Sequence, residues 1–140
     1  MTAPDLAPLW VLDTHVVVSA ALTAGGTCDR LLRAAVAGRV RLAWSAPLLA
    51  EYRAVLLRPK FGFSRPVVSA LLAVFDPAHQ VPAGASPALP DPDDAVFLAG
   101  ALATPDQVLV TGNAAHFPAK LSRPVRILSP AEALRELERE

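Results

Sequence analysis

Hydrophobic positions form short uninterrupted runs that alternate with longer segments of helical pattern. Leu9–Leu12 is a run of four apolar residues that ends at Asp13, and Val108–Val110 is a similar run that ends at Thr111. An unbroken apolar run bounded by polar residues is typical of a strand buried on both faces, because a half-exposed strand alternates. We therefore predict strands near residues 9–12, 40–44, 107–110 and 125–128.

The segments between these runs carry helix signals. Ser45 and Asp91 each stand just before a proline that suits a first helical turn, and Ser129 precedes Pro130 in the same way. Helices are predicted near residues 16–22, 27–37, 45–58, 64–75 and 91–103 and from 129 onward. Residues 77–90 are rich in proline and alanine and are interpreted as a connector, with at most a short strand near residues 80–81.

Strands that alternate with helices predict a parallel sheet covered on both faces. The expected fold class is therefore α/β, a three-layer α/β/α sandwich around a central, mainly parallel, twisted sheet. A length of 140 residues is enough for one domain with a real core. We expect a single domain over residues 1–140, in which residues 1–8 form a loose lead-in.

Composition narrows the class of protein. The chain is 53% hydrophobic but has no apolar run of about 18 residues, so no membrane span is expected. The N-terminus lacks a basic region followed by an apolar stretch, and the single cysteine excludes an internal disulfide framework. These features favour a cytoplasmic location.

Formal net charge is zero, but the charges are unevenly distributed. Between Asp29 and Arg65 there are eight basic residues and two acids, whereas acids outnumber bases after Val81. A basic half of this kind suits a polyanion, although solvated helix faces explain it equally well.

Three acids occupy positions that packing alone does not explain. Asp13 follows a buried strand, and the carboxyl edge of a parallel sheet is where ligands bind. Asp94 shares a helical face with Phe97 and Leu98, at offsets of three and four residues. Glu51 lies at the edge of another apolar helix face. All three carboxylates are therefore candidates to meet at the carboxyl edge of the sheet.

Each acid also has a structural explanation. Asp13 could cap the helix that follows it, Asp94 could belong to a capped first helical turn, and Glu51 could form an ion pair with Arg53 or Arg58. These alternatives stay open from the sequence.

Clustered carboxylates repel one another unless a cation neutralises them. Hard oxygen ligands suit Mg²⁺ or Mn²⁺, and such ions assist phosphodiester hydrolysis. His79, His116 and Cys28 show no ligand spacing with one another, so no zinc site is expected.

In order and spacing, these residues resemble the PIN domain family, and within it the VapC-like toxin components of bacterial toxin–antitoxin pairs. The resemblance runs from Val11 to about Leu137, and its matching pieces are Val11–Thr14, Ser45–Leu56, Leu56–Phe61, Asp91–Leu98 and Val110–Asn113.

The resemblance implies a metal-dependent ribonuclease in which Asp13, Glu51 and Asp94 are the catalytic, metal-binding acids. It also implies RNA as substrate, Mg²⁺ or Mn²⁺ as cofactor, a homodimer, and an antitoxin protein that blocks the site.

Two departures from the family pattern matter. The family often carries asparagine where this chain has His15, and a fourth acid where it has Asn113. With three acids we expect one tightly held ion. The departures also motivate an alternative, a weakened or inactive PIN-fold protein that binds RNA or a protein partner. A phosphoryl-accepting receiver domain is disfavoured, because Thr111 stands where a strand-end lysine is expected.

Other polar residues are secondary candidates. The Thr111 hydroxyl is expected to orient a site water or Asp94, His15 to hydrogen-bond Asp13 or a phosphate, and Asn113 to hold a water. Arg58 and Lys60 flank Pro59 and are candidates for contact with RNA phosphate. A dimer face is expected, if anywhere, on the helices between residues 45 and 75.

Overall fold

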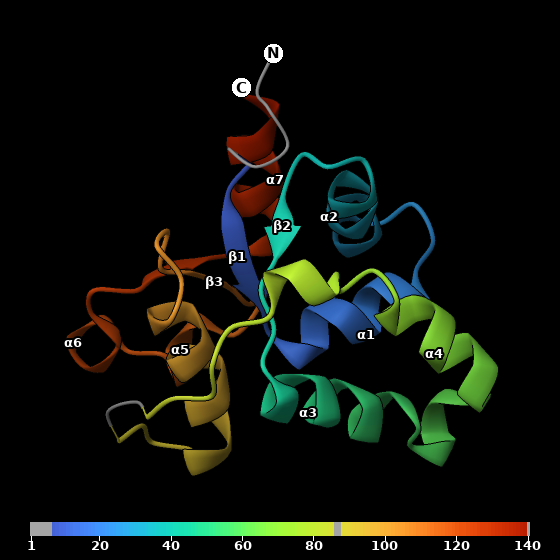
Figure 1. Cartoon of the computed structure of the whole chain (residues 1–140), viewed down its shortest axis with the longest axis horizontal. Helices are drawn as coiled ribbons and strands as arrows, with labels where there is room; N and C mark the ends of the chain where they lie inside the picture. Colours follow the sequence, from blue (N-terminus) through green and yellow to red (C-terminus); the bar gives the residue numbers. More distant parts are fainter. Residues whose placement is uncertain (1–6, 86–87, 140) are drawn as a thin grey trace.

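A computed structural model describes residues 7–85 and 88–139, and its centre is one parallel sheet (Figure 1). The strands lie in the order β2-β1-β3-β4, and every neighbouring pair is parallel. Their bounds are Leu9–Leu12 for β1, Arg41–Leu42 for β2, Val108–Val110 for β3 and Arg126–Leu128 for β4. The predicted α/β class is therefore confirmed. The short strand predicted near residues 80–81 is a single bridge between Trp44 and Gln80.

Strand β1 has neighbours on both sides, which explains why its four residues are all apolar and all buried. Its register pairs Leu12 with Val110 of β3, and Val110 in turn pairs with Leu128 of β4. The residues that follow these strands, Asp13 and Thr111, consequently lie side by side at the carboxyl edge of the sheet.

Helices cover both faces of the sheet. Figure 1 shows α5 on one side of β1 and β3, and α1 and α2 on the other side. Helix α3 packs against α1 and α5, and α7 packs against β4 and α2. The helices of the described residues are α1 (Thr14–Leu22), α2 (Thr27–Val36), α3 (Ala46–Leu56), α4 (Arg65–Leu72), α5 (Ala95–Leu102), α6 (Ala119–Ser122) and α7 (Pro130–Glu138). Short 3₁₀ turns lie at Pro59–Phe61 (η2), Pro77–His79 (η3), Pro92–Asp94 (η4) and Ala114–His116 (η5).

The predicted helix starts have a direct structural basis. The Ser45 hydroxyl accepts a hydrogen bond from the Leu48 amide, which satisfies one free N–H of α3. At α7 the side chains of Ser129 and Glu132 each accept a hydrogen bond from the other's backbone amide, which makes a complete capping box.

Two expectations are corrected. Ala7 is buried, its carbonyl accepts a hydrogen bond from the Arg41 side chain, and the Pro8 carbonyl accepts one from the Arg41 amide. These two residues are therefore held, and the rest of the expected lead-in, residues 1–6, lies outside the described residues. The helix predicted over 91–103 begins as turn η4 and becomes α-helical only at Ala95.

Tyr52 anchors α3 to the end of β1. Its side chain is fully buried, stacks on Phe75 with ring centroids 5.0 Å apart, and donates a hydrogen bond of 2.6 Å to the Leu12 carbonyl. Burial raises the pKa of the Tyr52 hydroxyl far above its ordinary value, and the charge of Asp13 adds to this. Tyr52 therefore stays protonated and acts only as a donor at this contact. Leu12 and Asp13 are fixed against α3 by this bond.

In the part of the chain that the structure describes, no helix combines the length and the hydropathy needed to cross a membrane.

Candidate metal centre

A small cavity of about 160 Å³ opens at the carboxyl edge of the sheet. The three acids predicted from the sequence all line it, although they come from the end of β1, from the middle of α3 and from η4. Its other walls carry further acids, two histidines and one arginine. The full lining is Asp13, Thr14, His15, Glu51, Val55, Arg58, Asp91, Asp93, Asp94, Phe97, Asn113 and His116.

Asp13 is only 5% exposed and is held from two directions. One carboxylate oxygen accepts a hydrogen bond of 2.7 Å from the Thr111 hydroxyl, and the other accepts one of 3.4 Å from the His15 amide. The second bond caps α1, so the capping explanation is correct, yet Asp13 lines the cavity as well. The Thr111 hydroxyl was expected to orient Asp94 or a water, and it orients Asp13 instead.

Thr111→Val tests this positioning, because valine keeps the shape and removes the hydroxyl. A hydrogen bond to a charged group contributes about 1.5–3 kcal/mol, so we expect a loss of that order in the free energy of unfolding. We also expect Mn²⁺ affinity to fall by roughly tenfold, as is typical when the partner of a ligand is removed. Thr104→Val is the matched control, because the buried Thr104 hydroxyl is hydrogen-bonded away from the cavity.

Urea denaturation and calorimetric titration with Mn²⁺ measure the two effects. Equal loss of Mn²⁺ affinity in the Thr111 and Thr104 variants would show that the hydroxyl of Thr111 does not serve the site.

Asp94 is largely enclosed, since its side chain is 13% exposed, and it contacts His116. The distance from Oδ2 of Asp94 to Nδ1 of His116 is 2.9 Å. Burial raises the pKa of the Asp94 carboxyl, the neighbouring His116 lowers it, and the charges of Asp91 and Asp13 raise it again. A carboxylate that burial and like charges both disfavour is one that a cation would stabilise.

His116 is a site residue that local sequence spacing did not reveal. One donor atom each from Asp91, Asp94 and His116 lie within 4.8 Å of one another, close enough to share an ion. His116 follows Asp94 by 22 positions in the chain. The two residues meet because η5, which follows β3, lies at the same carboxyl edge of the sheet as η4. Its place shortly after a strand end was the available signal. The spacing of His116 relative to His79 and Cys28, which argued against a zinc site, gives no indication of this proximity to Asp91 and Asp94.

Glu51 lies on α3, lines the cavity and is partly buried. The alternative explanation, an ion pair with Arg53 or Arg58, finds no support, because no such pair exists within residues 7–85 and 88–139. Arg58 lines the same cavity and brings a positive charge to its edge.

The remaining candidate residues differ in whether they line the cavity and in the contacts that they make. Asn113 lines the cavity, and its backbone N–H donates a hydrogen bond to the Thr111 hydroxyl. His15 also lines it but is 83% exposed, with Nδ1 3.6 Å from Asp13, so its side chain forms no hydrogen bond there. Lys60 does not line the cavity, and its ammonium group lies 5.1 Å from the centre of the Phe61 ring.

The chemistry of these side chains fits a divalent metal ion. The cavity carries five carboxylates, one amide and two imidazoles against a single guanidinium group. Carboxylate and amide oxygens are the donors that Mg²⁺ and Mn²⁺ prefer, and imidazole nitrogen is accepted by the later divalent ions. Acidic residues in this centre could therefore hold a metal ion.

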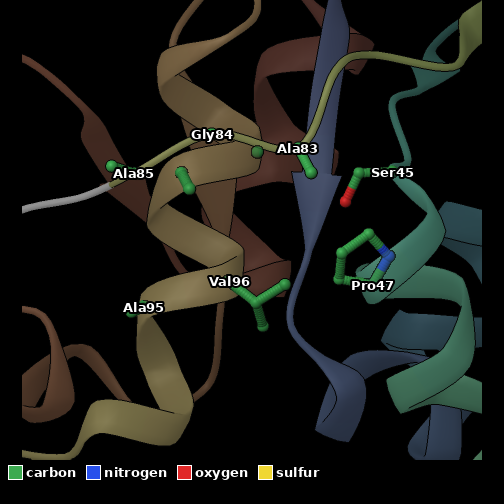
Figure 2. Close-up of a pocket in the computed structure, with 9 residues that line it drawn as sticks. Ser45, Pro47, Ala83, Gly84, Ala85, Ala95 and Val96 are labelled. Carbon is green, nitrogen blue, oxygen red and sulfur yellow. The ribbon is translucent and has the colours of Figure 1, made fainter.

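A second, larger hollow of about 400 Å³ has a different character (Figure 2). Val96 on α5 and Pro47 on α3 face each other across it, and residues 83–85 pass along its edge. Gly100 allows the close approach of the two helices, because a Cβ there would lie 2.8 Å from Cδ1 of Leu48. None of the residues that line this hollow is titratable, so it offers no carboxylate or imidazole ligand to a metal ion.

Fold and site together define a parallel α/β domain with an acidic cavity that could hold a metal ion at the carboxyl edge of its central strands. Comparison with protein families gives the same result, since the model of the PIN domain matches residues 10–115. The chain therefore belongs to the PIN domain family, whose members are generally metal-dependent nucleases. No curated protein and no solved structure matches it.

Proposed function

We propose that the protein is a metal-dependent endoribonuclease that hydrolyses RNA phosphodiester bonds, with Asp13, Glu51 and Asp94 as its catalytic, metal-binding acids. The observation that carries this proposal is the convergence of these three carboxylates from three separate segments on one small cavity. Membership of a nuclease family supports the same reaction type.

Each residue has a role that follows from its contacts. Thr111 holds the Asp13 carboxylate in place, and Tyr52 holds the backbone from which Asp13 projects. Asp94 supplies a second carboxylate in a poorly solvated position. A divalent ion bound by these acids would polarise the phosphodiester and lower the pKa of the attacking water. The side-chain amide of Asn113, which lines the cavity, would orient that water or a phosphate oxygen.

RNA must approach an acidic centre, so positive charge at its edge is needed. Arg58 lines the cavity, and its guanidinium group would contact a phosphate there. Lys60, two residues further along, would contact the RNA backbone outside the cavity.

The resemblance to VapC-like proteins extends the proposal to partners and setting. In this extended proposal the protein is the toxin of a toxin–antitoxin pair and is blocked by an antitoxin protein. It would form a homodimer, use Mg²⁺ or Mn²⁺ and act in the cytoplasm.

A second function is favoured by one observation. Asn113 lines the cavity where a fourth acid is common in the family, so the site has lower negative charge. A PIN-fold protein with such a site would bind RNA or a partner without metal-dependent turnover.

Cleavage of a mixed-sequence single-stranded RNA tests the proposal and separates it from this alternative. Purified protein is incubated with Mn²⁺, with Mg²⁺ or with chelator, and a single-stranded DNA of the same sequence is run in parallel. We expect cutting of RNA in the two metal lanes only. The Asn113→Asp variant is included, because an added carboxylate should raise activity if the wild-type site is one ligand short.

Cutting that persists in chelator, or equal cutting of DNA, would contradict the metal-dependent ribonuclease. Absence of cutting by both wild type and Asn113→Asp, while RNA is still bound, would favour the non-catalytic protein.

A further inference from the structure

We propose that a ring nitrogen of His116 binds the same divalent ion as Asp91 and Asp94, which makes this centre a mixed nitrogen–oxygen site that favours Mn²⁺ over Mg²⁺. This inference rests on the proposed function, because it concerns the ion that the proposed ribonuclease would use.

The geometry of the group supports a shared ion. Two ligands on opposite sides of an ion with bonds of about 2.1 Å lie roughly 4.2 Å apart. The donor atoms of Asp91, Asp94 and His116 all lie within 4.8 Å of one another, so only a small adjustment is needed. Asp13 and Glu51 do not belong to this group among the described residues, although both line the same cavity.

Two of the three side chains, those of Asp91 and His116, are exposed enough to make that adjustment. His116 stands on the short turn η5 and is 45% exposed, so its ring is not fixed by packing. Asp91 is exposed, and its carboxylate accepts a hydrogen bond from the Asp93 amide, which closes turn η4. Asp94 already contacts the imidazole at 2.9 Å and is the member common to this group and to the three predicted acids.

Donor chemistry then decides which ion is preferred. Mg²⁺ is bound almost entirely by oxygen and gives up its water reluctantly, whereas affinity for mixed nitrogen and oxygen sites rises along the first-row divalent ions. An imidazole ligand therefore raises the affinity for Mn²⁺ more than the affinity for Mg²⁺. In this chain the neutral nitrogen donor of His116 would partly replace the acid that is missing at position 113, where Asn113 stands.

Pulsed electron paramagnetic resonance of the Mn²⁺-loaded 140-residue chain provides the decisive measurement. A directly bound imidazole gives a ¹⁴N coupling that an imidazole outside the coordination sphere does not give. We expect this coupling in the wild type, its loss in His116→Asn, and its retention in His15→Asn, the matched control from the same cavity. Labelling the wild type with ¹⁵N-histidine should replace the ¹⁴N coupling by a ¹⁵N coupling without any amino-acid substitution.

Calorimetric titration measures the selectivity of the same proteins. His116→Asn should weaken Mn²⁺ binding by at least roughly tenfold and change Mg²⁺ binding much less. A ¹⁴N coupling that is absent from the Mn²⁺-bound wild type, survives His116→Asn, or disappears in His15→Asn would overturn the inference. So would an equal loss of affinity for both ions.

The two proposals can fail separately. Mn²⁺ bound without a nitrogen ligand, together with metal-dependent RNA cleavage, would overturn the role of His116 and leave the ribonuclease intact. Nitrogen coupling from His116 without any RNA cleavage would support the metal site and contradict the ribonuclease.

Discussion

Asp94→Asn is expected to lower metal-dependent RNA cleavage by about two orders of magnitude or more, which is a loss of about 2.7 kcal/mol or more in transition-state stabilisation. Asparagine keeps the shape of the side chain and removes the charge that attracts the ion. Asp94 contacts His116 and is common to the three proposed catalytic acids and to the group that could share an ion, so its loss should affect both. The initial rate of cleavage with Mn²⁺ is the measurement.

Asp93→Asn is the matched control for this variant. Asp93 adjoins Asp94, carries the same charge and also lines the cavity, but it is exposed and belongs neither to the three proposed catalytic acids nor to the group that could share an ion. Its variant should keep cleavage within about threefold of the wild type, a difference of about 0.65 kcal/mol. Cleavage that survives in purified Asp94→Asn, or that falls equally in both variants, would exclude Asp94 from the catalytic centre.

The largest effect on stability is expected for Tyr52→Ala. This change removes a fully buried ring and its contact with Phe75, and it leaves the Leu12 carbonyl without its hydroxyl donor. Truncation of a buried aromatic residue typically costs about 3–5 kcal/mol, against a total stability of about 5–15 kcal/mol for a domain. The variant should therefore fold marginally or not at all at 37 °C.

Tyr52→Phe separates the hydroxyl from the ring. It keeps the stacking and loses only the bond to Leu12, for which a cost of about 1–3 kcal/mol is expected. Urea denaturation followed by circular dichroism measures both free energies. If Tyr52→Ala lost less stability than Tyr52→Phe, the ring would not be part of the core that supports the site.

The sequence was most informative where one physical cause dominates. Burial on both faces accounts for the unbroken apolar run of β1, and the register of parallel strands then places Asp13 at the carboxyl edge. The capped starts of α3 and α7 were predictable for a similar reason. A capping serine accepts a hydrogen bond from a backbone amide three residues later, so this signal depends only on local sequence.

Other features depend on contacts that local patterns do not encode. Thr111 was expected to serve Asp94, but it serves Asp13, because register and not spacing decides which strand ends are neighbours. The contact between His116 and Asp94 joins two short turns in different segments, and neither turn has a repeat that reveals its orientation. Lys60 was chosen for its charge, yet its side chain turns to the ring of Phe61.

The assembly of the cavity from distant segments also links metal supply to the survival of the protein. Asp13, Glu51, Asp94 and His116 are brought together only by the sheet and the helices packed on it, so an unfolded chain offers no comparable site. A divalent ion at 100 times its dissociation constant would stabilise the native state by about 2.7 kcal/mol. Depletion of that ion would then expose the chain to proteases as well as stop its chemistry, so that the amount of protein present would follow the metal content of its surroundings.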